Sequence, residues 1–185
     1  CVAGCNQIKE TAEQPVNFEK QLTFTASREG VSPDTKSVRM DDGSVWWNAG
    51  EEVSMFYGSG TNGGSKFTST NTVLAETVEF NGSISMSGSG KNFWGIYPYS
   101  EENSCDGSSV TVVIPSEQEG VEGNFSGNAF PAVATSSSMN LAFWNICGGI
   151  KFFVSRSDIK SVTIKGNGGE ALAGKVKVAF NADGK

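Results

Sequence analysis

Residues 21–26 read QLTFTA, and this short stretch decides the fold. Leu22, Phe24 and Ala26 fall on one face of an extended chain, and threonines occupy the positions between them. Successive side chains of a strand point to opposite faces of its sheet, so this alternation is typical of a strand with one buried face. The stretch therefore predicts an antiparallel strand that covers a core.

The same period of two returns along the rest of the chain. The further strands that it predicts are EVSMFY (52–57), GSISMSG (82–88), SVTVVIP (109–115), KSVTIKG (160–166) and GKVKVAF (174–180). FWGIYPY (93–99) reads as a strand that ends at Pro98. No segment gives a convincing helical pattern, and the one ambiguous stretch, VLAETVEF (73–80), favours a strand through its β-branched residues.

Turn signals separate these segments. The pairs are Asp42-Gly43, Asn62-Gly63, Asn81-Gly82, Asp106-Gly107, Gly148-Gly149 and Gly168-Gly169. Asn-Gly and Asp-Gly supply the positive φ angles that tight hairpins require. Many short strands divided by such turns indicate a sandwich or a barrel. We expect an all-β chain that forms an antiparallel β-sandwich.

Composition narrows the function. The 185 residues carry a net charge of -6, with 18% charged residues, 23 glycines and no histidine. An acidic chain without Lys/Arg clusters is not expected to bind nucleic acid. The absence of histidine removes the usual catalytic triads and most zinc sites. No apolar run approaches the roughly 18 residues of a membrane-spanning helix.

Four motifs resemble catalytic or ligand sites, and the context argues against each. GSGTNG (58–63) and GEALAGKV (169–176) resemble phosphate-binding loops, but no helix is predicted after either. Glu51-Glu52 and Glu101-Glu102 are neighbours, so each pair points to opposite faces and reads as solvated surface charge. We expect no enzyme, no metal and no cofactor.

Aromatic and cysteine residues leave other options open. Trp46 and Trp47 are adjacent, so one is expected to point inward and one outward, and the outward indole could contact a sugar or a peptide. Burial of the tryptophans in the core is the favoured interpretation. Cys105 and Cys147 could form a disulfide or both remain reduced. Nothing in the cysteine spacing resembles a metal site.

Three stretches together resemble fimbrillin-like proteins of Bacteroidales. They are VWWNAGEEVSMFYG (45–58), FWGIYPYS (93–100) and LAFWNICGGIKFFVSRSDIKSVTIKGNGGEALAGKVKV (141–178). The similarity runs from about Gln21 to the end of the chain. It implies a transthyretin-like β-sandwich, with residues 20–185 as the N-terminal domain of two. It also implies a non-enzymatic fimbrial subunit or accessory protein that acts in adhesion and assembly.

Both ends of the chain fit this interpretation. Val2-Ala3-Gly4-Cys5 resembles a bacterial lipobox, so residues 1–4 would be the remnant of a signal peptide and Cys5 the site of lipid attachment. A Cys1–Cys5 disulfide is the alternative. Residues 5–19 would form a polar tether to the outer membrane, which the chain would contact through its lipid alone. The turn signal Asp183-Gly184 predicts that a further strand follows.

The resemblance implies partners and a processing step. Other fimbrial subunits would bind by donor-strand exchange after a trypsin-like protease cuts behind the first strand. The possible cleavage sites are Arg28 in TASREG and Arg39 in SVRMDD, and an ordinary surface role is the favoured interpretation of both. A different class of function remains open: a surface lipoprotein that binds glycans through exposed Trp46 or Trp47.

Overall fold

The computed structural model describes residues 18–28, 38–39, 45–86, 92–120, 129–150 and 152–181. Regular structure in these ranges consists of strands, with no helix, so the all-β prediction is confirmed for them. Accordingly, none of the described residues forms a helix long and apolar enough to cross a membrane. The predicted lipobox, and the tether as far as residue 17, lie outside the described residues. The first strand begins at Phe18, two residues before the predicted domain start.

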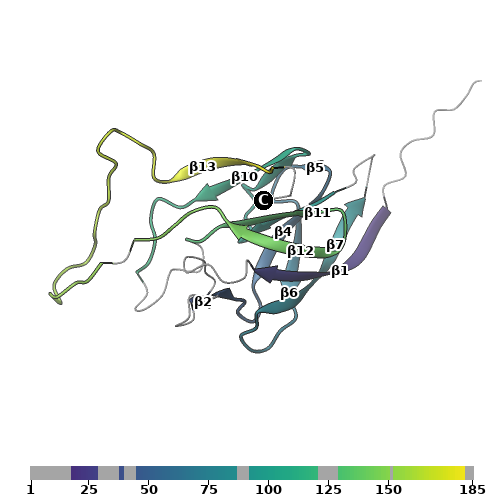
Figure 1. Ribbon diagram of the computed structural model, residues 1–185, viewed down its shortest axis with the longest axis horizontal. Coiled ribbons are helices and arrows are strands. Elements are labelled where there is room, and N and C mark those ends of the chain that lie inside the picture. Colours follow the sequence, from purple (N-terminus) through teal and green to yellow (C-terminus); the bar gives the residue numbers. More distant parts are fainter. Residues whose placement is uncertain are drawn as a thin grey trace, which may run out of the picture.

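The strands follow one another in the order labelled in Figure 1. They are β1 (Phe18–Arg28), β2 (Val38–Arg39), β3 (Val45–Trp46), β4 (Glu52–Tyr57), β5 (Ser59–Gly60), β6 (Ser65–Ser69), β7 (Thr77–Met86), β8 (Phe93–Tyr97), β9 (Ser104–Asp106), β10 (Ser109–Ile114), β11 (Ala132–Ser136), β12 (Asn140–Asn145) and β13 (Gly174–Ala179).

Seven of these strands form a closed barrel. Their order is β1-β12-β11-β8-β4-β6-β7, and β7 pairs with β1 to complete the ring. All neighbours are antiparallel except β1 and β12, which are parallel with Thr25 opposite Asn140. The first long strand is therefore paired with β7 over residues 18–27 and with β12 over residues 25–28. The pairing of β1 with β12 closes the ring of strands.

A second sheet covers one side of the barrel. Its order is β13-β10-β9-β5, and β2 and β3 form a separate pair. The residues that join the second sheet to the outer faces of β4, β8 and β11 are Phe56, Trp94, Ile96, Cys105, Val110, Val112 and Val133. The one-sided burial predicted for residues 52–57 is therefore wrong. Val53 and Met55 face the barrel interior, whereas Phe56 is buried beneath the second sheet.

Aromatic rings fill the barrel. Phe24 contacts Phe67 edge to face, with ring centroids 5.3 Å apart, and Trp47 contacts Phe80 and Phe143 at 5.0 and 5.3 Å. Such edge-to-face pairs add about 0.5–1.5 kcal/mol beyond the burial of their area. All five rings are essentially inaccessible to solvent. The inward face predicted from QLTFTA is thus confirmed as core.

The turn signals had mixed outcomes. Asn62 and Gly63 form a turn with φ angles of 55° and 78°, as predicted. Asn81-Gly82 does not, because both residues lie within β7. A Cβ atom on Gly82 would lie 2.7 Å from the ring of Phe67, so this glycine permits close packing rather than a turn. Asp42-Gly43 and Asp183-Gly184 lie outside the described residues.

The strand predicted at KSVTIKG (160–166) is absent from the structure. These residues lie in a long segment between β12 and β13 that contains no strand among its described residues. Figure 1 shows this segment extending away from both sheets. Alternation of side chains predicts which face a strand would bury, but a strand also needs a hydrogen-bonding neighbour. No described strand lies beside residues 160–166 to provide one.

Candidate functional site

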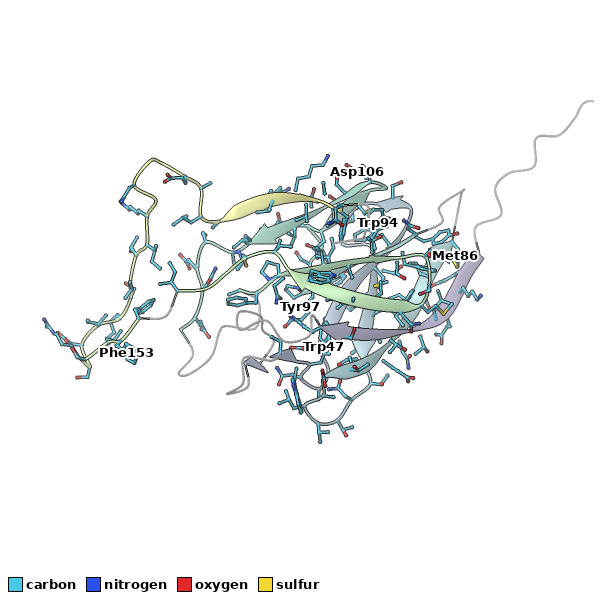
Figure 2. All side chains as sticks on the ribbon, viewed as in Figure 1. Trp47, Met86, Trp94, Tyr97, Asp106 and Phe153 are labelled. Carbon is cyan, nitrogen blue, oxygen red and sulfur yellow. The ribbon has the colours of Figure 1, made fainter. Side chains whose placement is uncertain are left out.

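The segment between β12 and β13 is the most exposed apolar part of the described structure. We call residues 146–150 and 152–173 the arm. Eight of its large apolar side chains are 45–89% exposed: Ile150, Phe152, Phe153, Val154, Ile159, Val162, Ile164 and Leu172. Figure 2 shows Phe153 far from the core residues Trp47 and Tyr97. Single exposed apolar residues are normal, but a continuous series of them marks an interaction surface.

Local contacts shape the arm. Arg156 donates a hydrogen bond from Nε to Oδ1 of Asp158 at 2.9 Å, across a turn at residues 157–158. Glu170 accepts a hydrogen bond from the backbone N–H of Gly168 at 2.9 Å, across a second turn. Both contacts are exposed and join residues two positions apart, so they stabilise turns rather than a core. The arm is locally ordered, yet its apolar side chains remain uncovered.

The arm leads into β13, the outermost strand of the second sheet. Within the described part of the chain β13 pairs with β10 alone. Val176 and Val178 of β13 are only partly buried, whereas Val110 and Val112 of β10 are almost inaccessible to solvent. Phe180 follows β13 and contacts Trp94 edge to face, with centroids 5.2 Å apart. The inner face of this sheet is therefore incompletely covered along its β13 edge.

Ion pairs cross the outer face of the same sheet. Lys177 of β13 lies 2.8 Å from Oδ2 of Asp106, and Lys175 lies 3.9 Å from Oε2 of Glu102. Asp106 also accepts hydrogen bonds from Ser109 and Ser108. Lys177 first, then these two serines, hold the pKa of the Asp106 carboxyl well below its usual range. The carboxylate therefore ties the turn between β9 and β10 to the edge strand.

Charge is unevenly distributed along the chain. Residues 152–177 contain five Lys and Arg against two Asp and Glu. Residues 45–120 contain two Lys against nine Asp and Glu. The arm and β13 are thus basic, and most of the remaining structure is acidic. Opposite net charges on two surfaces favour their association.

A shallow pocket lies at the start of β13. Its volume is 410 Å³, and it is lined by residues 113–117, Glu102 and Gly174. Its lining includes two acidic residues, Glu102 and Glu117, and three apolar residues, Val113, Ile114 and Pro115. The pocket is open to solvent beside the point where the arm ends. It therefore offers an acidic and apolar surface at the end of the β10–β13 pair, where the arm joins β13.

Arg28 lies inside the barrel. Its Cζ atom is 4.0 Å from the ring centroid of Trp47 and 4.5 Å from that of Tyr97. Nη1 donates a hydrogen bond to Oδ1 of Asn145 at 3.2 Å, and the Tyr97 hydroxyl donates to Oε1 of Glu51 at 2.9 Å. Burial lowers the pKa of Arg28 to about 10, so the guanidinium still carries its charge at neutral pH. Two aromatic faces hold the cation.

The predicted processing sites differ in what the structure describes. Arg28 is 5% exposed, and its strand is paired on both edges. A protease could reach it only after the barrel opens, so cleavage there stays a prediction about another conformation. The backbone of Arg39 lies in β2 opposite Val45. The Arg39 side chain and the predicted lipid site Cys5 lie outside the described residues.

The two adjacent tryptophans point as expected. Trp47 is completely buried and Trp46 is partly exposed, which confirms that one indole faces inward and the other outward. Only Trp46 of this pair could contact a glycan. The sequence analysis did not foresee the meeting of Trp47 with Arg28. The sequence does indicate that Arg28 points inward, because it continues the alternation of the inward positions 22, 24 and 26 of β1.

Cys105 and Cys147 are both free thiols. The Cys105 thiol donates a hydrogen bond to the carbonyl oxygen of Gly58 at 3.2 Å, and burial raises its pKa to about 11. The Cys147 thiol contacts the carbonyl oxygen of Ala129 at 3.8 Å. The described residues contain no group of three or more His, Cys, Asp or Glu side chains able to hold a metal ion.

Comparison with models of known protein families, with curated proteins and with solved structures found no match. The resemblance to fimbrillin-like proteins therefore depends on the three sequence stretches quoted above. The exposed apolar arm and the edge strand β13 indicate a surface for association with another protein chain, independently of that resemblance.

Proposed function

We propose that this chain is a non-enzymatic subunit or accessory lipoprotein of surface fimbriae in Bacteroidales, which acts in adhesion and assembles by β-strand addition. The observation that carries the proposal is the arm, where Val162 and Ile164 alternate with polar residues but lie in no strand. An extended segment of this kind can add to the edge of another sheet. Ladder hydrogen bonds then provide affinity, and alternate side chains provide specificity.

The free energy for such binding comes from covering the arm. Removal of apolar surface from water is worth roughly 25 cal/mol per Å². Eight large apolar side chains at least 45% exposed are an unfavourable feature of an isolated molecule. When the arm binds to another subunit, these side chains are removed from water, and this favours binding. An exposed apolar surface of this kind suits a chain that associates with another subunit.

The proposal includes a fold relationship. The second sheet packed on the barrel through a shared apolar cluster supports a layered, transthyretin-like arrangement, and the resemblance implies that this is the N-terminal domain of two. The three sequence stretches that resemble fimbrillin-like proteins lie in β3–β4, in β8 and from β12 to β13. They thus contribute to both sheets as well as to the arm. The alternative function, glycan binding, is supported only by the partly exposed indole of Trp46.

The anchor is tested at Cys5. Lipid on this cysteine, followed by the tether up to residue 19, would hold the domain at the outer membrane. We expect the full-length protein, produced in a Bacteroidales host, to incorporate labelled palmitate and to sediment with the outer membrane. Cys5→Ala should abolish both, and the matched control Cys1→Ala should abolish neither. An unlabelled protein in the cytosol would contradict the proposal.

Assembly is tested in the same host. Fimbriae sheared from cells should contain the protein, and Val162→Asp with Ile164→Asp should remove it, because charges cannot enter an apolar contact. Val73→Asp is the control, since Val73 is 70% exposed but lies outside the arm. Equal amounts of the arm variant and the parent in the fimbriae would contradict a role of the arm in assembly.

A further inference from the structure

We infer that residues 160–165 of the arm add as a strand to the exposed edge of β13 in a second copy of this chain, so that two copies exchange arms. This inference rests on the proposed role in assembly and names the partner. It follows from four features of the described structure: the incomplete inner face of β13, the residue pattern of the arm, the lysines of the edge and the acidic pocket beside it.

The inner face requires apolar side chains at alternate positions. Val176 and Val178 are partly buried because no described strand lies beyond them. A parallel strand that places Val162 beside Val176 also places Ile164 beside Val178. Both incoming side chains then extend the apolar cluster beneath the second sheet. Apolar side chains that lie beside each other on one face of a sheet stabilise it.

The outer face requires side chains that tolerate lysine. In the same register Ser161 and Thr163 lie beside Lys175 and Lys177, and neither hydroxyl conflicts with the ion pairs that these lysines make. Two β13 edges could not pair so well, because their lysines would face one another. Like charges directly opposite each other destabilise a sheet. The edge therefore selects the arm rather than another copy of β13.

The ends of the contact are complementary in charge. The register that aligns Val162 with Val176 places Lys160 beside Gly174. Gly174 lines the acidic pocket that also contains Glu102 and Glu117. A lysine delivered to this pocket meets two carboxylates. The basic arm and the acidic structure around the pocket thus attract each other before the strand hydrogen bonds form.

A second copy, rather than the same chain, is the occupant that the geometry points to. Figure 1 shows the arm leading away from β13 of its own chain. Turns at residues 157–158 and 167–168, the second with Glu170 bonded to Gly168, give the arm this course. Exchange between two copies leaves both turns intact. Because each arm meets the partner's edge, the contact is reciprocal and closes as a twofold dimer.

The first test is the oligomeric state of the purified 185-residue chain by sedimentation equilibrium. We expect a dimer whose dissociation constant rises at least about tenfold in the double variant Thr163→Pro with Ile164→Pro, because one of two successive N–H groups in a strand faces the neighbouring strand and proline removes it. Thr163 and Ile164 lie in no strand within their own molecule, so the monomer fold is retained. Ala171→Pro is the matched control in the same arm and should dimerise like the parent.

The second test locates the contact. Equal amounts of light and ¹⁵N-labelled chains are mixed and treated with a carbodiimide, which joins a lysine to a carboxylate at contact distance. We expect mixed-label peptides that link Lys160 to Glu102 or Glu117. Links confined to one label would show the arm on its own chain and overturn the inference. A parent that stays monomeric, or a dimer unaffected by Thr163→Pro with Ile164→Pro, would also overturn it.

These outcomes are separate from those of the proposed function. A monomeric chain that is still lipid-anchored and present in sheared fimbriae would overturn arm exchange and leave the fimbrial role intact. A dimer with the expected cross-links in a protein absent from fimbriae would support arm exchange and contradict the fimbrial role.

Discussion

Arg28 is the residue at which packing and charge are most closely joined. Its strand directs it inward at the end of the barrel, where Trp47 and Tyr97 enclose the guanidinium. A buried ion that loses its partners is costly, but so is the cavity left when a long side chain is removed. This residue should therefore matter more for stability than an arginine of the surface.

The first prediction concerns Arg28. Arg28→Ala should lower the free energy of unfolding by roughly 2–4 kcal/mol, because the rings and Asn145 lose their partner. Arg28→Lys should recover little of this loss, because an ammonium cannot stack flat between two rings. Urea denaturation followed by tryptophan fluorescence measures both. Arg156→Ala, in the exposed arm, is the control and should leave the midpoint unchanged. Equal midpoints for all three variants would refute the argument.

The second prediction concerns the free thiols. Burial raises the pKa of Cys105 to about 11, so its reactive thiolate is scarce at pH 8. Iodoacetamide at pH 8 should alkylate the partly exposed Cys147 first and Cys105 only when the protein unfolds. Peptide mapping by mass spectrometry separates these sites from Cys1 and Cys5. Faster modification of Cys105 than of Cys147 would contradict the buried position.

At the scale of elements, burial separates two phenylalanines that lie ten positions apart. Phe143 of β12 is inaccessible to solvent in the barrel core, and Phe153 of the arm is 89% exposed. Phe143→Ala should cost roughly 3–5 kcal/mol of stability. Phe153→Ala should stay within about 0.5 kcal/mol of the parent. Thermal and urea unfolding provide the measurement, and similar losses in both variants would place the arm in the core instead.

The turn between β9 and β10 should respond to acid. Lys177 and the neighbouring serines lower the pKa of Asp106 below its ordinary value near 3.8. A carboxyl group whose pKa is lower in the folded state than in the unfolded state stabilises the fold at pH values above about 4. This stabilisation is lost as the pH falls further. Asp106→Asn should therefore flatten the pH dependence of stability below about pH 4.

Urea midpoints measured from pH 2 to pH 7 test this prediction. Lys177→Met should reduce the same dependence, because Lys177 is the largest cause of the shift. A parent-like pH profile in both variants would show that the ion pair does not form in solution.

Limited proteolysis distinguishes the arm from the barrel strands. Trypsin cleaves most readily in exposed segments without regular structure. At protein concentrations below the dissociation constant of the dimer, we expect early cleavage after Lys160 and Lys165, while the bond after Arg28 remains intact until global unfolding. Timed digestion with mass spectrometry identifies the order. Early cleavage after Arg28 would show that β1 leaves the barrel readily, as the processing hypothesis requires.

Element positions were largely predictable from alternation, and the failures have physical causes. QLTFTA and GKVKVAF became β1 and β13 because each found a neighbouring strand. KSVTIKG has an equally regular pattern but no described neighbour, so it stayed outside the sheets. Gly82 follows an asparagine, yet it lies within a strand and allows the ring of Phe67 to pack closely against it instead of forming a turn. Local residue types cannot reveal either circumstance.

At the scale of the whole molecule, pairing between distant strands determines the architecture. Sequence patterns predicted the β class and that one of the adjacent residues Trp46 and Trp47 points inward. They left a sandwich and a barrel open and favoured the sandwich, because closure depends on β1 lying parallel to β12, which local patterns do not reveal. They also did not predict the candidate surface, since an apolar alternation normally indicates burial rather than exposure.

The parallel pairing of β1 with β12 has a consequence for biosynthesis. Phe18–Arg28 is made early and finds its last neighbour only when Asn140–Asn145 has been added. Until then β1 can pair with β7 but not with β12, and the aromatic rings that will fill the barrel remain accessible to solvent. Contacts so far apart in sequence form slowly. A holding chaperone would therefore have most to protect during synthesis of the middle third of the chain.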